Sequence, residues 1–271
     1  MHPKQTLTLA ALALPFLLGA CSDAAAPNTR SQVAVRFGRS AASAALAPSS
    51  ARFSRLGSSA ATSAGLVVQG TNGTLNITNV SFIVAEVELE CAGDDDAAPA
   101  CADFEAPPAF VKLPLGTGAV DAATAGVPAG SYDELEFEVE NLEADADDDA
   151  AKRAQIAAVL ASARAAHPDF PEKVSMVVEG TFTPSGSTQA TPFRTYFDAE
   201  IEVEMGLTPP LAVSDAGASR ALAVDVQPAL WFKRADGSVM DLSRFDYAKT
   251  GALVGFELEM ERGFRAVEFD D

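Results

Sequence analysis

Strict alternation of glutamate with apolar residues constrains this chain more than any other feature. In residues 134–140 every even position is glutamate, while Leu135, Phe137 and Val139 occupy odd positions. Residues 193–205 repeat the pattern, with an apolar or threonine side chain at every odd position and three glutamates near the end. Successive side chains of a β-strand point to opposite faces, so each stretch predicts a strand with one buried and one charged face. The chain is therefore expected to be mainly β.

Further strands and turns support this fold class. Strands are predicted by similar patterns at 66–69, 74–78, 80–90, 174–183, 222–226 and 231–232. The 80–90 stretch is interpreted as one strand with Ile83, Ala85, Val87 and Leu89 on one face. Turns are predicted at Asn72-Gly73 and after Pro184, and Pro209-Pro210 is expected to end the strand before it.

One segment has a helical period instead. Ile156, Val159, Leu160 and Ala163 fall at helical spacing and predict a helix over about residues 148–166, which His167-Pro168 ends. The stretch 252–267 fits both periods, and its glycines favour a strand. Short strands with tight turns and one helix predict an antiparallel β-sandwich with one inserted α-helix.

The first 21 residues have the pattern of a secretory signal. Lys4 precedes an apolar run from Leu7 to Leu18, and small residues lead to Cys21. The run is too short for a comfortable membrane span. The segment resembles the signal peptide and lipobox of bacterial lipoproteins, which predicts cleavage after residue 20 and acyl chains on Cys21. Membrane attachment would then come through an N-terminal lipid, with Ser22 indicating the outer membrane of the bacterial cell envelope. Plain secretion is the alternative.

Composition divides the rest of the chain in two. Residues 21–65 are rich in Ala, Ser and Pro, contain five arginines and one acid, and are interpreted as a low-complexity tether. Residues 32–37 alternate and form a possible strand within it. Residues 66–271 are predicted to be the acidic sandwich domain. The basic arm is either a solvated linker or lies on the acidic body or on anionic phospholipid.

Two cysteines remain after Cys21. Cys91 and Cys101 form an even pair in an oxidising compartment, which predicts a disulfide. The alternatives are two free thiols or a metal site, although two cysteines without a nearby histidine make a poor zinc site.

The net charge of −19 excludes nucleic acid as a partner and favours a basic protein or another cationic partner. Glutamates occupy every second position at 86/88/90, 134/136/138/140, 200/202/204 and 257/259/261. Neighbouring strands with this pattern would form an acidic sheet face. The alternative interpretation is a solvated face that prevents edge pairing.

Two aspartate clusters are candidate calcium ligands, because hard cations bind clustered oxygens. They are Asp94, Asp95 and Asp96, and Asp145, Asp147 and Asp149. The second cluster is no EF-hand, because Ala150 and Ile156 stand where that loop requires glycine and glutamate. The alternative is a solvated acidic loop that caps the helix. Structural calcium is the only bound group that the sequence suggests.

Catalytic signatures are scarce. His167 is the only histidine after the signal segment, and it lies at a predicted helix end. The sequence has no Gly-rich phosphate loop and no zinc signature. We therefore expect a non-enzymatic binding or structural module. The alternative is a carboxylate-based, glycosidase-like envelope hydrolase.

Three segments together resemble uncharacterised bacterial lipoproteins. They are Asn72–Leu89, Phe110–Leu115 and Val127–Tyr132, in which a long strand is followed by a leucine-rich strand and a Pro-Ala-Gly-x-Tyr turn. The resemblance covers roughly residues 70–142. It implies an immunoglobulin- or transthyretin-like β-sandwich of unknown function, held at the cell envelope. It implies no activity and no site residues.

Overall fold

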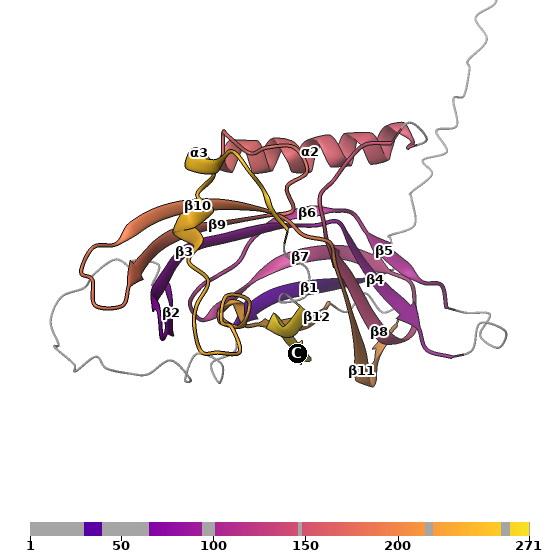
Figure 1. Cartoon of the computed structure of the whole chain (residues 1–271). Helices are drawn as coiled ribbons and strands as arrows, with labels where there is room; N and C mark the ends of the chain where they lie inside the picture. The colour runs from indigo at the N-terminus through magenta and orange to yellow at the C-terminus, as the bar shows by residue number, and fades with distance from the viewer. Residues whose placement is uncertain are drawn as a thin grey trace, which may run out of the picture.

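The computed structural model describes residues 30–39, 65–93, 101–145, 148–214, 219–255 and 261–270. These residues form three β-sheets and one long helix, so the chain is mainly β as predicted (Figure 1). The predicted signal segment, Cys21, Asp94–Asp96 and Asp147 lie outside the described residues.

Sheet A contains four strands in the order β14-β12-β1-β7. Their bounds are Phe264–Asp270, Arg220–Val226, Ser31–Arg39 and Gly118–Val127. The possible strand at 32–37 is thus β1, and it lies between two partners rather than in a tether. β1 is an inner strand of sheet A, so residues 31–39 of the predicted tether segment belong to the sheets that the structure describes.

Sheet B follows the order β13-β10-β9-β3-β2, and β6 pairs with β3 beside that path. The strand bounds are Val254–Gly255, Thr191–Asp198, Met176–Pro184, Gly73–Val84, Leu66–Gly70 and, for β6, Ala109–Lys112. The predicted hairpins β2–β3 and β9–β10 are both present.

Sheet C is fully antiparallel, with the order β11-β8-β4-β5. Its strands are Ile201–Val213, Gly130–Val139, Glu86–Cys91 and Phe104–Ala106. The prediction of antiparallel sheets is wrong at two pairs elsewhere, because β1 runs parallel to β12 and β10 runs parallel to β13. These partners are far apart in the sequence or separated by other elements, so no hairpin constrains their direction.

Two predicted long strands each cross from sheet B to sheet C. One divides at Ala85 into β3 and β4, and the other divides after Asp198 into β10 and β11. The crossing at Ala85 also changes which of the alternating side chains face the main core. Ile83 packs beneath the long helix, whereas Phe82, Val84, Val87 and Leu89 all join the main core. The predicted single face through Ile83 and Val87 is therefore wrong, because the strand changes sheet between them.

Pro209 and Pro210 do not end their strand. β11 continues to Val213, with a register shift between Gly206 and Leu211. The prolines lie in this irregular part, where a ladder amide is not required. The ambiguous stretch 252–267 contains β13, the 3-10 turn Glu261–Gly263 and the start of β14, while residues 256–260 lie outside the described part.

One main core joins the three sheets, and Phe37 of β1 lies at its centre. Its ring centroid is 5.8 Å from that of Phe82 in sheet B, 4.9 Å from Phe137 in sheet C and 6.0 Å from Phe264 in sheet A. Phe37 is fully buried. A residue from the predicted tether therefore connects all three sheets.

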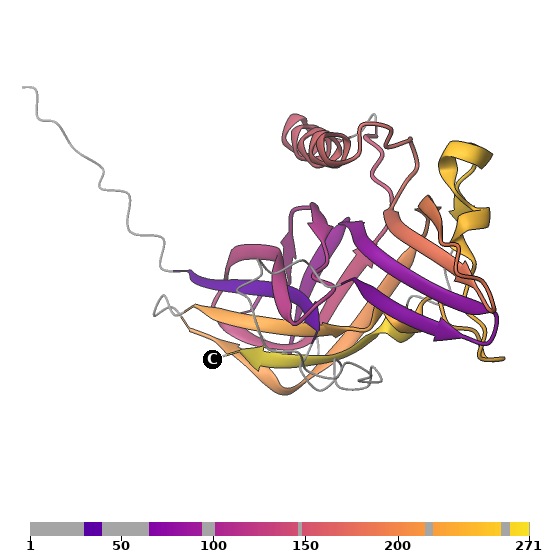
Figure 2. The same ribbon diagram turned by 90° about the vertical axis from the view of Figure 1, so that its left-hand side faces the viewer.

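The predicted helix is α2, Ala150–Ala166. Its N-cap is Asp149, whose side chain accepts a hydrogen bond from the amide of Lys152, and its C-cap is His167. α2 covers a second apolar cluster that includes Ile83, Phe170, Val177 and Tyr196. Figure 2 shows the helix nearly end-on, raised above the strands.

Short elements complete the described chain. They are the 3-10 turns Pro228–Leu230 and Leu242–Arg244 and the one-turn helix α3, Tyr247–Thr250. Within the described ranges, no helix has both the length and the apolar character needed to cross a bilayer.

Candidate functional site: an acidic face on sheet C

Sheet C brings three of the four glutamate runs together on one face. Its inward positions, among them Val87, Leu135, Phe137 and Val203, belong to the main core. The alternating glutamates therefore point away from that core. We call this surface the acidic face; its residues are Glu86, Glu88, Glu90, Glu105, Glu134, Glu136, Glu138, Glu202 and Glu204.

Strand register aligns these glutamates in rows across the sheet. Glu138 lies between Glu86 and Glu202, and Glu134 lies opposite Glu90. The central row contains Glu105, Glu88, Glu136 and Glu204. Neighbouring strands are only about 4.8 Å apart, so directly opposed carboxylates repel each other. The prediction of an acidic sheet face is thus confirmed for three runs.

The fourth run lies largely outside the described residues. Glu257 and Glu259 lie outside the described residues, and Glu261 begins a 3-10 turn. Glu140 and Glu200, which flank the face, lie just beyond the ends of β8 and β11.

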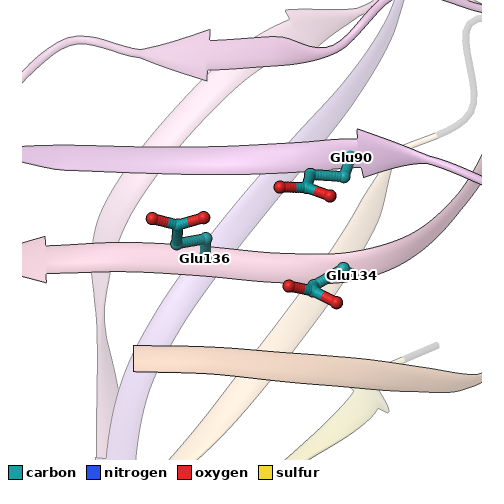
Figure 3. Close-up of side chains that lie close together, drawn as sticks. All are labelled: Glu90, Glu134 and Glu136. Atoms are coloured by element: carbon teal, nitrogen blue, oxygen red, sulfur yellow. The ribbon is translucent and has the colours of Figure 1, made fainter. Parts of the chain in front are cut away.

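Among the residues that the structure describes, two groups of three carboxylates are close enough to share a cation. They are Glu90, Glu134 and Glu136, and Glu136, Glu202 and Glu204; within each group one oxygen per residue lies within 4.8 Å of the others. Figure 3 shows the first group, with Glu90 on one strand and Glu134 and Glu136 on the next, all on the same side of the sheet. Glu136 belongs to both groups and is the centre of the site.

The crowding affects protonation. Burial, followed by repulsion from Glu202 and a hydrogen bond with its carboxyl group, raises the pKa of Glu136 to about 7. Burial also raises the pKa of Glu88, Glu134 and Glu138, and neighbouring glutamates add to each shift. None of the four strands of sheet C contains lysine or arginine between its described bounds. Protonation or a bound cation would therefore relieve the repulsion on this face.

Basic residues of neighbouring elements lie at the margins of the acidic face: Arg265 of β14 lines a cavity together with Glu202 and Glu204. Lys152 of α2 lowers the pKa of Glu86 and Glu140, but burial and nearby glutamates outweigh it in both. These residues and Lys152 line a cavity of about 360 Å³ between the N-terminal half of α2 and the edge of sheet C. The cavity also contains Glu105, Asp145 and Asp148 at its wall.

Part of the predicted calcium loop makes local contacts. Asp149 caps α2, and the Asp148 carboxylate accepts a hydrogen bond from the Asp145 amide at 2.8 Å. The structure does not bring Asp145 and Asp149 into either carboxylate group described above. Because Asp147 and Asp94–Asp96 lie outside the described residues, calcium at these two clusters stays a prediction.

The two remaining cysteines form the predicted disulfide. Cys91 ends β4 and Cys101 precedes β5, and their sulfur atoms are bonded at 2.02 Å. The bond joins adjacent strands at one end of sheet C, beside Tyr132 on β8. It therefore supports the acidic face structurally, and the alternative of two free thiols is excluded.

His167 is the C-cap of α2, as its predicted place at the helix end indicates, and it is buried at 5% exposure rather than solvated. It lies near Glu179, Arg194, Asp169 and Tyr196 rather than near the acidic face. No local sequence pattern signals this burial, because the ring that meets His167 belongs to Phe110, which is distant in the sequence.

Comparison with known proteins adds no family to this description. No family model, no curated protein and no solved structure matches the chain.

Proposed function

We propose that this chain is a lipid-anchored, non-enzymatic module of the bacterial cell envelope, with a β-sandwich arrangement of its sheets, whose acidic face binds divalent cations. The observation that carries the proposal is the pair of three-carboxylate groups that share Glu136. Hard divalent cations take several oxygen ligands from clustered carboxylates. Calcium is the cation that we use to test it.

The anchor in this proposal is lipid on Cys21. Ser31 follows Cys21 by ten residues, and an extended chain spans at most about 3.6 Å per residue. The start of β1 would then lie within about 36 Å of the anchor. The proposed module is thus held close to its membrane, which we take to be the outer membrane, rather than extended on a long tether.

A glycosidase-like hydrolase is the less supported alternative. Such enzymes place two carboxyl groups on opposite sides of a substrate bond within a cleft. Glu90, Glu134 and Glu136 instead lie side by side on one face (Figure 3). Side-by-side oxygens favour the binding of a cation over the hydrolysis of a substrate held between two acids.

Thermal unfolding in calcium or sodium tests the proposal. At equal ionic strength, millimolar calcium should raise the melting temperature more than sodium, since a bound ligand stabilises the folded state by mass action. At a calcium concentration 100 times the Kd, this stabilisation is about 2.7 kcal/mol. The variant E134Q/E136Q/E204Q should lose most of the calcium-specific increase.

Two control variants identify the site. E143Q/E172Q/E268Q removes the same number of charges from exposed positions outside the acidic face and should keep the calcium response. D145N/D147N/D149N should also keep it; if instead this variant alone loses the response, the loop is the site. If calcium and sodium raised the melting temperature of the wild-type protein equally, both salts would act only by screening charge, and the proposal would be contradicted.

A further inference from the structure

Helix α2 is attached to the sheets by few side chains. Of its 17 residues, only Ile156, Val159 and Ala163 are buried. The cavity of about 360 Å³ adjoins its N-terminal half, and a second cavity of about 330 Å³, lined by Leu142, Leu160 and Phe170 among others, adjoins its C-terminal half. A helix with so little buried apolar surface can open locally while the strands stay folded.

The C-terminal end of α2 is held through His167. The backbone amide of His167 donates a hydrogen bond to the carbonyl of Ala163 at 2.8 Å, and its ring meets Phe110 edge-on with centroids 6.2 Å apart. The Nδ1 atom is buried and has no hydrogen-bond partner. Its nearest carboxylate oxygen, from Glu179, is 3.8 Å away, which is too far for a hydrogen bond.

Charged groups from several elements face this ring. Glu179 of β9 accepts a hydrogen bond from Nε of Arg194 at 2.6 Å, so its charge is already matched. Arg194 of β10 also contacts Asp169 at 2.6 Å, and Asp169 accepts a hydrogen bond from the Tyr196 hydroxyl at 2.9 Å. Lys112 of β6 faces the ring as well, and Arg164 lies one turn earlier on α2.

This environment accommodates a neutral imidazole better than a charged one. Burial lowers the pKa of His167 below its usual 6.5; Glu179 and Asp169 oppose the shift, while Arg194 and Lys112 add to it. The ring of His167 has a lower pKa when α2 is docked than when α2 is released. Docking is therefore favoured at pH values above the ordinary pKa of 6.5, and this contribution to docking is lost as the pH falls below 6.5.

We propose that α2 is an acid-released lid, in which protonation of the buried His167 ring lifts the helix from the second apolar cluster. Released into water, the imidazolium is hydrated and no longer lies against Phe110. The surface that opens contains Ile83, Val177 and Tyr196. This proposal is independent of cation binding at the acidic face.

Hydrogen exchange of the full chain at pH 7.5 and pH 5.5 tests the lid. After correction for the intrinsic pH dependence of exchange, amides of residues 150–166 should exchange several-fold faster at pH 5.5, while β9 and β10 stay protected. An environment-sensitive apolar dye should bind more strongly at pH 5.5, since released α2 uncovers apolar surface. H167Q, which stays neutral, should remove the pH dependence of both measurements.

E136Q is the matched control, because Glu136 titrates in the same range on sheet C. It should leave the acid response of α2 unchanged. A response that persists in H167Q, or α2 exchange that is equal at both pH values in the wild-type protein, would overturn the proposal.

If H167Q fails to fold, the pKa of the His167 ring measured by NMR tests the proposal. His167 is the only histidine left once the predicted signal segment is cleaved after residue 20, so the mature protein should give one imidazole signal by NMR. In uncleaved protein, H2Q removes the second signal. A His167 pKa above 6.5 in the folded protein, with α2 still protected when the ring is charged, would mean that protonation strengthens docking and would refute the lid.

Discussion

One carboxylate oxygen of Glu136 on β8 lies within 4.8 Å of one of Glu202 on β11, across neighbouring strands of the acidic face. Burial and repulsion from Glu202 favour the protonated form of Glu136 and raise its pKa to about 7. Glu136 therefore holds a proton in a pH range where an isolated glutamate has lost it. This relationship makes the acidic face sensitive to pH.

The E136Q variant tests this sensitivity. The pKa of Glu136 rises from 4.5 to about 7 on folding, so the folded state binds the proton more strongly and the wild-type protein loses stability as the pH rises across this range. Glutamine carries no charge, so E136Q should be more stable than wild type at pH 8 by roughly 0.2–1 kcal/mol, the usual cost of a like-charge cross-strand pair. The difference should shrink towards pH 4.5.

Denaturant unfolding at pH 4.5 and pH 8 measures that difference. E172Q, which removes an exposed charge outside the acidic face, is the control and should change stability little at either pH. If E136Q were no more stable than wild type at pH 8, the raised pKa of Glu136 would be wrong.

Truncation of Phe37 tests whether β1 belongs to the core. Phe37 is fully buried and contacts rings from all three sheets. F37A should therefore lower the free energy of unfolding by about 3–5 kcal/mol. V67A, at a side chain that is 52% exposed, should cost under about 0.5 kcal/mol. A similarly small loss of unfolding free energy in F37A would mean that residues 31–39 do not belong to the core and form part of a tether.

Removal of the disulfide should destabilise the end of sheet C. Cys91 and Cys101 are ten residues apart, and opening a loop of this length costs about 2–3 kcal/mol in the chain-entropy model. C91S/C101S should lose this amount in urea unfolding. Wild-type protein unfolded with and without reductant should differ by a similar amount, and an unchanged midpoint in both comparisons would contradict the prediction.

Substitution of Cys21 tests the proposed anchor separately from the fold. C21S should move the protein from the membrane fraction to the soluble envelope or medium fraction, because two or three acyl chains hold a protein stably at a bilayer. Its melting temperature after purification should equal that of delipidated wild type. C21S protein that stays with membranes after a high-salt wash would show that another feature provides attachment.

Local pattern predicted much of this structure. Alternation located β8, β9 and β10, the 3.6-residue period located α2, and the even cysteine count predicted the disulfide. Each of these features is encoded by neighbouring residues, because strand and helix periods arise from backbone geometry alone. The alternation also determined that glutamates share faces, before any strand had a partner.

Tertiary structure alone decided which strands meet. The single strand predicted through Ala85 is two strands in the structure. Ile83 packs in the second apolar cluster beneath α2, whereas Val87 packs in the main core. Only contacts with β6, β8 and α2 distinguish these two clusters. Alternation predicts a possible strand at residues 32–37, but the Ala- and Ser-rich flanks place it within a tether; only the structure shows that Phe37 packs against Phe82, Phe137 and Phe264 from distant segments.

The acidic face shows the same division. The sequence by itself determined that three strands each carry glutamate at every second position. Register between β4, β8 and β11 decided that Glu136 lies between Glu88 and Glu204 and meets Glu202. Repulsion and burial depend on distance in space, and strand pairing brings together residues that are tens of positions apart in the chain.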